Sequence, residues 1–259
     1  MIRYMLLGLV QGFTEFLPVS SSGHLVLAEH LLNLDPPGVL LETMLHWGTL
    51  AAVLIVFRQD IVSLLKSLRG KGRVEQRKEV GFLIVGTVPV VAVGLLLRET
   101  IQSAFSSLIG VGIGLLITAT LLAVSYLARR RARRAVIHFP DAVAIGLAQA
   151  IAVFPGISRS GTTISVGTLT GLTAAQAARF SFLLAIPALF GAGLLHLPEA
   201  VQSLGTQNGA GILLGAACAF GSGWLALRSA LALIARGRFW IFAVYCALVG
   251  GATIVWSVL

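Results

Sequence analysis

The chain has 259 residues and carries 29 charged side chains, 19 Lys and Arg plus 10 Asp and Glu, which is 11% of the total. Soluble domains average about 25% charged residues, and 57% hydrophobic residues with a mean hydropathy of +0.93 leave too few polar side chains to cover a soluble surface. These values exclude an ordinary soluble protein and predict an all-α integral membrane protein.

The net charge of +9 is concentrated in three basic clusters. Of the 19 Lys and Arg, seven fall in 58–78, five in 129–134 and three in 228–238. Each cluster lies between long apolar segments, which is typical of cytoplasmic loops under the positive-inside rule. We therefore expect a multi-pass protein of the cell (inner) membrane. We expect no nucleic-acid partner, because neither interleaved aromatic residues nor a recognition module accompanies the charge.

The first apolar stretch, residues 1–39, is interrupted near its middle by Pro18 and by the run Ser20-Ser21-Ser22-Gly23. It therefore predicts a re-entrant helical hairpin that enters the membrane from outside and leaves on the same side. A signal peptide over residues 1–22 is the alternative interpretation. Glu15 and Pro18 interrupt its apolar region, and no convincing small-residue cleavage site follows, so we favour the hairpin.

Six further apolar segments are long enough, or nearly so, to span a bilayer as helices. They lie at about residues 40–57, 80–97, 106–128, 179–195, 209–227 and 239–257. The links at 98–105 and 196–208 carry one basic residue and none, so we expect both links on the outside. The first three spans then have the opposite orientation to the last three.

A second broken stretch, residues 135–178, is predicted to enter from the cytoplasm and return there. It matches the first at a shift of 138 residues, with seven identities in 16 positions, among them Ser20 with Ser158 and Ser22 with Ser160. Chance similarity of apolar sequence is the alternative. We predict two inverted-topology repeats, 1–134 and 135–259, each a re-entrant hairpin plus three spans within one membrane domain. Irregular backbone at membrane depth must be buried or line a cavity, so both tips should meet at a central polar site.

Arg159 lies in the middle of the second broken stretch, where an ionisable side chain is costly and therefore a functional candidate. Its segment, Ser158-Arg159-Ser160-Gly161-Thr162-Thr163, is predicted to open a helix. Helix-start N–H groups, hydroxyls and a guanidinium together suit a phosphate or another oxyanion. The alternative is an ion pair between Arg159 and Glu15 that binds no substrate.

The first tip offers groups that could act on such an anion. Glu15 follows Gln11 by four residues, so both side chains lie on one helix face. Together with Arg159, the residues Glu15, Ser21 and His24 form a set suited to phosphoryl transfer, although His24 alone is as readily a core histidine or a helix cap. Glu42 and His46, four residues apart on the first span, are expected to support this set.

The segments Glu15–His24 and Pro155–Thr163 closely resemble the two signature segments of the undecaprenyl-diphosphate phosphatase family, also known as the bacitracin-resistance family. The resemblance covers essentially the whole chain. It implies an enzyme that removes the terminal phosphate of undecaprenyl diphosphate, which returns the carrier lipid to peptidoglycan synthesis, at a site that opens to the outer face. It implies catalytic positions at Glu15, Ser21 and His24 and phosphate-binding positions at Ser158, Arg159, Ser160 and Thr163.

The candidate residues follow from both lines of reasoning. The candidate catalytic residues are Glu15, Ser21, His24 and Arg159. The candidate substrate-binding residues are Gln11, Ser20, Ser22, Ser158, Ser160, Gly161, Thr162 and Thr163. The nucleophile stays open between Ser21, His24 and an activated water. The oligomeric state also stays open, and a homo-oligomer is one possibility. The alternative function is a transporter that flips a polyprenyl phosphate or moves an anion without hydrolysis.

One departure from the family pattern concerns cofactors. Many members carry a second glutamate where this chain has Gln11. The resemblance implies a Mg or Ca requirement, but a neutral amide cannot supply the second carboxylate of a metal site. We therefore assign no certain metal ligand, keep Glu15 as the one candidate, and expect a divalent cation to arrive on the diphosphate. No organic cofactor is indicated, and the expected partners are the polyprenyl diphosphate and membrane lipids.

Overall fold

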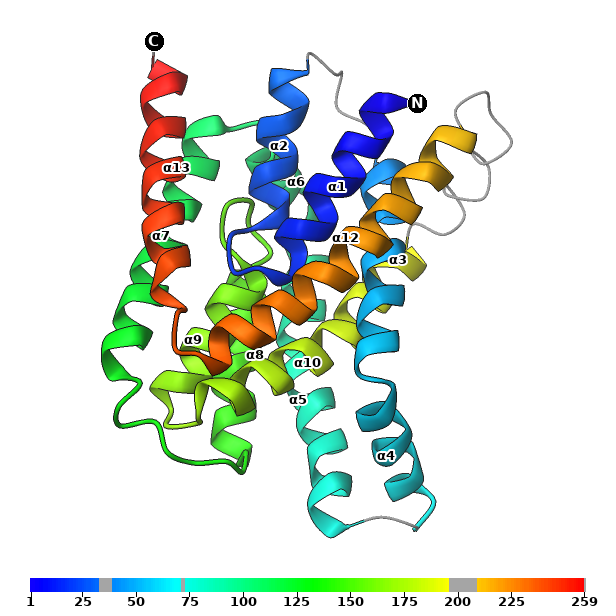
Figure 1. Cartoon of the computed structure of the whole chain (residues 1–259), viewed down its shortest axis with the longest axis vertical. Helices are drawn as coiled ribbons and strands as arrows, with labels where there is room; N and C mark the ends of the chain where they lie inside the picture. The colour runs from blue at the N-terminus through cyan, green and yellow to red at the C-terminus, as the bar shows by residue number, and fades with distance from the viewer. Residues whose placement is uncertain (33–38, 71–72, 196–208, 259) are drawn as a thin grey trace.

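The computed structural model describes residues 1–32, 39–70, 73–195 and 209–258, and these residues form twelve helices and no strand (Figure 1). The helices are α1 Ile2–Phe16, α2 Ser21–Leu31, α3 Val39–Val56, α4 Arg58–Leu68, α5 Val74–Leu96, α6 Arg98–Ala104, α7 Leu108–Ala128, α8 Phe139–Ile151, α9 Arg159–Leu169, α10 Ala174–Leu195, α12 Gly209–Ala235 and α13 Trp240–Val258.

Five of these helices are long and apolar enough to cross a membrane: α5, α7, α10, α12 and α13. The pair α3 and α4 supplies a sixth candidate when taken together, although the two helices are bent by 76°. A backbone in hydrocarbon must satisfy its own hydrogen bonds, which a helix does. The prediction of an all-α integral membrane protein is therefore confirmed.

Several predicted boundaries were wrong, because polar sequence that we expected to form links between the apolar runs is partly helical. Part of the first basic link is helical as α4, and part of the expected outer link 98–105 is α6. Helix α12 extends to Ala235 instead of ending near residue 227, so Arg228 lies within it. Lys and Arg are good helix formers, and hydropathy alone does not detect such extensions. The expected link 196–208 lies outside the described residues.

Both broken stretches form pairs of short helices, α1 with α2 and α8 with α9, and the helices within each pair contact one another. The first arm of each pair packs against a long helix of the other half of the chain: α1 against α12, and α8 against α5. The α1 contact depends on small residues. A Cβ added to Gly12 would lie 2.0 Å from Ser222 Oγ, and one added to Gly8 would lie 2.2 Å from the Gly215 carbonyl oxygen. Small residues allow such close approach of helices.

Arg134 joins the two ends of the second helix pair. Its guanidinium donates two hydrogen bonds of 2.8 Å to the Asp141 carboxylate at the start of α8, and a third, of 2.6 Å, to the Thr170 carbonyl just after α9. The hydrogen bond with Asp141 raises the pKa of Arg134 above its usual value. One of the five arginines of the basic cluster 129–134 therefore closes the base of the hairpin.

Candidate active site

The tips of the two helix pairs share one pattern of capping. Ser20 precedes α2, and its Oγ accepts the Gly23 N–H at 3.3 Å. Ser158 precedes α9, and its Oγ accepts the Gly161 N–H at 3.1 Å. In each tip the capping hydroxyl also lies 3.3 Å from the hydroxyl two residues on, that of Ser22 or Ser160. Serine is a favoured N-cap, and these contacts satisfy N–H groups that the helix itself leaves unpaired.

The two tips contact one another, as expected from the polar sequence at both breaks. Their loops lie side by side near the middle of the molecule in Figure 1. Ser160 Oγ donates to the Leu17 carbonyl at 3.3 Å. A Cβ added to Gly23 would lie 3.1 Å from Gly156 Cα, so the backbones nearly touch. This contact brings the N-terminal ends of α2 and α9 to the same region.

Glu15 is the centre of the polar contacts at this meeting point. It is buried, with 7% of its surface exposed. Its Oε1 accepts a hydrogen bond from Arg159 across the two tips, and its Oε2 accepts from Ser21 Oγ at 2.6 Å and from Gln11 Nε2 at 3.0 Å. His46 Nε2 lies 3.8 Å from the same Oε2. The ion pair of Glu15 with Arg159, which was the alternative interpretation of Arg159, is present, Gln11 lies on the same helix face as Glu15, and His46 approaches as expected.

The two histidines of the site present their rings in the same way. His24 Nδ1 lies 2.8 Å from the Ser20 carbonyl oxygen, and His46 Nδ1 lies 2.7 Å from the Glu42 carbonyl oxygen. Both partners are backbone acceptors one helical turn earlier, so each Nδ1 carries a proton and each Nε2 points away from its own helix. The Nε2 of His46 faces Glu15, whereas that of His24 is 2.7 Å from the Tyr245 hydroxyl on α13.

The two threonines of the second tip, Thr162 and Thr163, are both buried. Thr163 Oγ1 donates to the Arg159 carbonyl at 2.7 Å and lies 2.5 Å from Ser181 Oγ on α10. It is fully buried, and its contacts join α9 to α10. Thr162 is also buried, and among the described residues its hydroxyl has no partner. Thr163 thus supports Arg159 through the helix backbone in this structure.

Three residues near the site were not found by sequence reasoning: Thr118, Ser181 and Tyr245. Thr118 Oγ1 on α7 accepts the Ser158 N–H at 2.9 Å, and its one proton is shared between the Gly156 carbonyl at 3.1 Å and the Gly114 carbonyl of α7 at 3.0 Å. Its signal in the sequence is one of two threonines, Thr118 and Thr120, in an apolar helix, and nothing in that pattern identifies a distant partner. Gly156 takes a positive φ of 86°, a conformation that glycine adopts without steric cost, and so turns its carbonyl within the loop.

The side chains around Glu15 do not fit a divalent cation held by the protein. Gln11 Oε1 is buried without a partner among the described residues and could supply one oxygen. Both oxygens of Glu15 are already engaged, one of them by a guanidinium. Mg²⁺ and Ca²⁺ sites need several oxygen ligands. Within the described part of the chain, moreover, no group of three or more His, Cys, Asp or Glu is placed to hold a metal.

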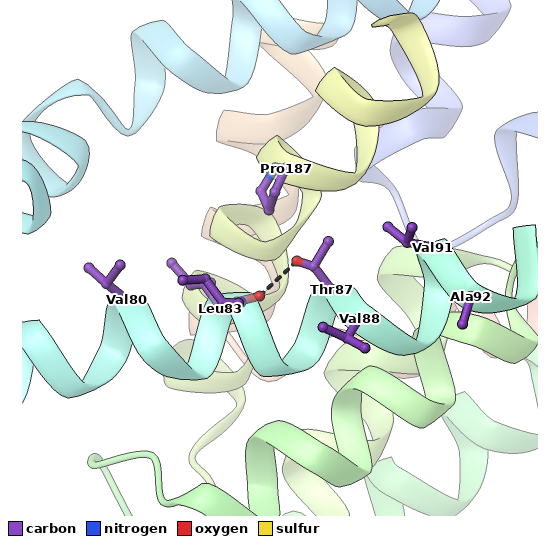
Figure 2. Close-up of a pocket in the computed structure, with 8 residues that line it drawn as sticks. Val80, Leu83, Thr87, Val88, Val91, Ala92 and Pro187 are labelled. Atoms are coloured by element: carbon purple, nitrogen blue, oxygen red, sulfur yellow. Dashed lines mark hydrogen bonds between the residues drawn. The ribbon is translucent and has the colours of Figure 1, made fainter. Parts of the chain in front are cut away.

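A separate apolar groove lies between α5 and α10 (Figure 2). It has a volume of about 500 Å³ and is lined by Val80, Leu83, Ile84, Thr87, Val88, Val91, Ala92 and Pro187. Thr87, the one hydroxyl of this lining, donates to the Leu83 carbonyl at 2.7 Å. The groove contains none of the candidate catalytic residues and offers hydrocarbon rather than charge, so we separate it from the polar site.

Fold and site together define an all-α integral membrane protein in which two broken helix pairs bring a buried carboxylate, a serine and an arginine into contact. The model of the family described as "Bacitracin resistance protein BacA" matches residues 4–252, and the chain belongs to this family. It is similar to proteins named undecaprenyl-diphosphatase from Desulfosudis oleivorans, at 42% identity over 98% of this chain and 97% of the relative, and from Syntrophotalea carbinolica, at 43% identity over 96% of both. A protein of the same name from Methanosphaera stadtmanae is 38% identical over 98% of this chain and 97% of its own length.

Proposed function

We propose that this protein hydrolyses undecaprenyl diphosphate to undecaprenyl phosphate and inorganic phosphate, and so returns the carrier lipid for peptidoglycan synthesis and confers bacitracin resistance. Membership of the family and the names of its relatives support the substrate. The observation that carries the chemistry is the Ser21 hydroxyl, which donates to Glu15 at 2.6 Å while Arg159 is bound to the other oxygen of the same carboxylate.

In this proposal Ser21 is the nucleophile. Glu15 accepts the Ser21 proton as Oγ bonds to the terminal phosphorus, and the bond from that phosphorus to the bridging oxygen breaks. Undecaprenyl phosphate leaves with the bridging oxygen. Water then attacks the phosphoserine, inorganic phosphate departs, and Glu15 returns the proton to Ser21. A serine held by hydrogen bond to a buried carboxylate is poised for this transfer.

Arg159 and the two helix starts bind the phosphate. The N-termini of α2 and α9 begin at Ser21 and Arg159, so unpaired N–H groups and the positive ends of two helix dipoles lie together there. Arg159 has a planar guanidinium with five N–H donors. One of its terminal nitrogens donates to Glu15, and the remaining donors are those that we assign to the phosphate. The developing charge on the phosphoryl oxygens is stabilised by these donors. A divalent cation, where the reaction needs one, enters as the counter-ion of the diphosphate.

We further propose that the chain forms two inverted-topology repeats, with six spans and two re-entrant hairpins, in the cell (inner) membrane. Two observations support this arrangement. Both tips have the same capping contacts, and the packing of α1 on α12 has its counterpart in the packing of α8 on α5. The basic links set the cytoplasmic side of the spans. The resemblance to the family supports an opening of the site to the outside.

The test is phosphate release from undecaprenyl diphosphate by the purified protein in detergent. Detergent removes the two sides of a membrane, so a protein that only flips or transports a lipid gives no product. Ser21→Ala is the matched variant, because it removes the hydroxyl and leaves Glu15 paired with Arg159. We expect release by the wild type and loss of release in Ser21→Ala. Absence of release by folded wild-type protein would contradict the proposal.

A further inference from the structure

The orientation of His24 is fixed by more than its own helix. Its Nδ1 lies 2.8 Å from the Ser20 carbonyl oxygen, which only accepts, so this nitrogen carries a proton. Ser20 has a φ of 72°, unusual for a residue other than glycine, and its carbonyl faces the ring. In the neutral imidazole the lone pair is therefore on Nε2.

That lone pair meets a hydroxyl from the last helix of the chain. Tyr245 on α13 places its phenol oxygen 2.7 Å from His24 Nε2, and the geometry makes the phenol the donor. The two rings also stack, with centroids 5.6 Å apart and planes inclined by 11°. A ring held at both nitrogens and across one face has one orientation, whereas a ring held only at Nδ1 can swing about that bond.

Packing between α2 and α13 alone does not account for this contact. The same two helices are also joined by His30 and Trp256, whose rings meet edge to face at 5.1 Å. Cys246, next to Tyr245, lies 3.6 Å from the Pro18 carbonyl in the first tip. Tyr245 itself is 41% exposed, so its ring contributes little to the buried core. Its distinguishing feature is the hydroxyl, and that hydroxyl is bound to His24.

We propose that Tyr245 is a positioning residue for the hydrolysis: its hydroxyl donates to His24 Nε2 and so holds the ring in one tautomer and one orientation. A proton then reaches Nε2 through that hydroxyl, which gives its own proton to Nε2 as it takes one from the attacking water. This inference rests on the proposed function, because it assigns His24 a part in the proton transfers of that reaction. A fixed tautomer matters there, since only the nitrogen without a proton can accept one.

The first test is kinetic and uses Tyr245→Phe, which keeps the stacked ring and removes only the donor. Because Tyr245 acts through His24 rather than through the substrate, the loss belongs in kcat, with KM almost unchanged. We expect kcat to fall roughly tenfold, the effect of losing one hydrogen bond at a reacting group. The matched control, Trp256→Leu, removes the other aromatic contact between α2 and α13 and should keep wild-type kcat. An unchanged kcat in Tyr245→Phe, or an equal loss in the control, overturns the proposal.

A double-mutant cycle shows whether the effect passes through His24. In a His24→Gln background, Tyr245→Phe should cause no further loss. Full additivity of the two losses overturns the proposal, because it would mean that Tyr245 acts independently of His24. Wild-type activity in His24→Gln overturns it also, since there would be no histidine function to support.

A spectroscopic measurement separates this inference from the proposed function. The measurement is NMR of protein labelled with ¹⁵N-histidine, and the signals of His24 are assigned as those that disappear in His24→Gln. We expect them to report a protonated Nδ1 and a hydrogen-bonded, unprotonated Nε2, and the Nε2 signal should move in Tyr245→Phe. This measurement requires no turnover, so it tests the contact between Tyr245 and His24 even if the wild type releases no phosphate. A protonated Nε2, or an Nε2 signal unchanged in Tyr245→Phe, overturns the inference.

Discussion

Glu15 and Arg159 form an ion pair between the two tips, in which the carboxylate is buried and the guanidinium is partly buried. Removing one partner of such a pair leaves an uncompensated charge, which costs about 3–5 kcal/mol of stability. The same carboxylate accepts a hydrogen bond from Ser21, so loss of Glu15 also removes the proton acceptor that we propose for Ser21. Variants that keep the charge are therefore the informative ones.

Arg159→Lys tests whether the guanidinium binds phosphate beyond its contact with Glu15. Lysine keeps the positive charge and the ion pair but loses the planar fork of donors that matches a phosphate. We expect kcat/KM to fall by at least about tenfold, or about 1.4 kcal/mol. Phosphate release measures the loss, and thermal unfolding in detergent checks that the variant stays folded. Near wild-type turnover would reduce Arg159 to a structural partner of Glu15.

Gln11 tests the role of a divalent cation. Its amide donates to Glu15 at 3.0 Å, so Gln11→Glu places a second carboxylate against the first. Two carboxylates on one helix face bind a hard cation better than one, and we expect Gln11→Glu to remain active but to depend more strongly on Mg or Ca. Glu15→Gln, which removes the proton acceptor, should abolish hydrolysis.

The measurement is a Mg or Ca titration of phosphate release after chelation, for the wild type and Gln11→Glu side by side. Identical curves would mean that no cation contacts this helix face. Loss of activity at every concentration would mean instead that the Gln11 donor is required. Either outcome contradicts the expectation.

At the level of helices, the breaks between α1 and α2 and between α8 and α9 are held by neighbours as well as by their own caps. Thr118 on α7 accepts the Ser158 N–H, and it shares its one hydroxyl proton between the Gly156 carbonyl and the Gly114 carbonyl of its own helix. The Ser158 and Gly156 groups belong to the irregular backbone between α8 and α9. One threonine thus fixes the start of the helix that carries Arg159.

Thr118→Val tests this anchor, because valine keeps the shape and removes both hydrogen bonds. Leaving a buried N–H unpaired costs about 1–3 kcal/mol, and we expect lower thermal stability together with reduced phosphate release. Thr120→Val is the control: Thr120 is on the same helix, is exposed, and donates only to the Leu116 carbonyl within α7. Equal behaviour of the two variants would show that the anchor does not matter.

The sequence predicted what depends on local pattern. Long apolar runs predicted the spans, and Pro18, Pro155 and the serines predicted the breaks, because proline and capping residues end helices by local chemistry. The cost of a charge in an apolar segment singled out Arg159 as a functional candidate, and its pairing with Glu15 was kept only as the alternative interpretation. Contacts such as that of Tyr245 with His24, 221 residues apart, depend on which helices become neighbours, and no sequence period specifies that.

At the scale of the whole molecule, the distribution of charge predicts on which side of the membrane each link lies. The basic links 58–78 and 129–134 should lie in the cytoplasm, and the links between the other ends of the spans should lie outside. In the proposed inverted repeats, the orientation of the first repeat sets that of the second, because the two tips meet at one site. Side-specific labelling of single cysteines can therefore test the whole arrangement.

We expect a cysteine at Arg131 to react only from the cytoplasm. A cysteine at Ser103, an exposed residue of α6, should react only from outside. A cysteine at Gly205, which lies outside the described residues, should behave like that at Ser103. Cys218 and Cys246 are first replaced by alanine, and retained phosphate release is the control for that background. Reaction of the Ser103 or Gly205 position with a cytoplasmic reagent would rule out the inverted repeats, since both halves could not then present their hairpins from opposite sides to one central site.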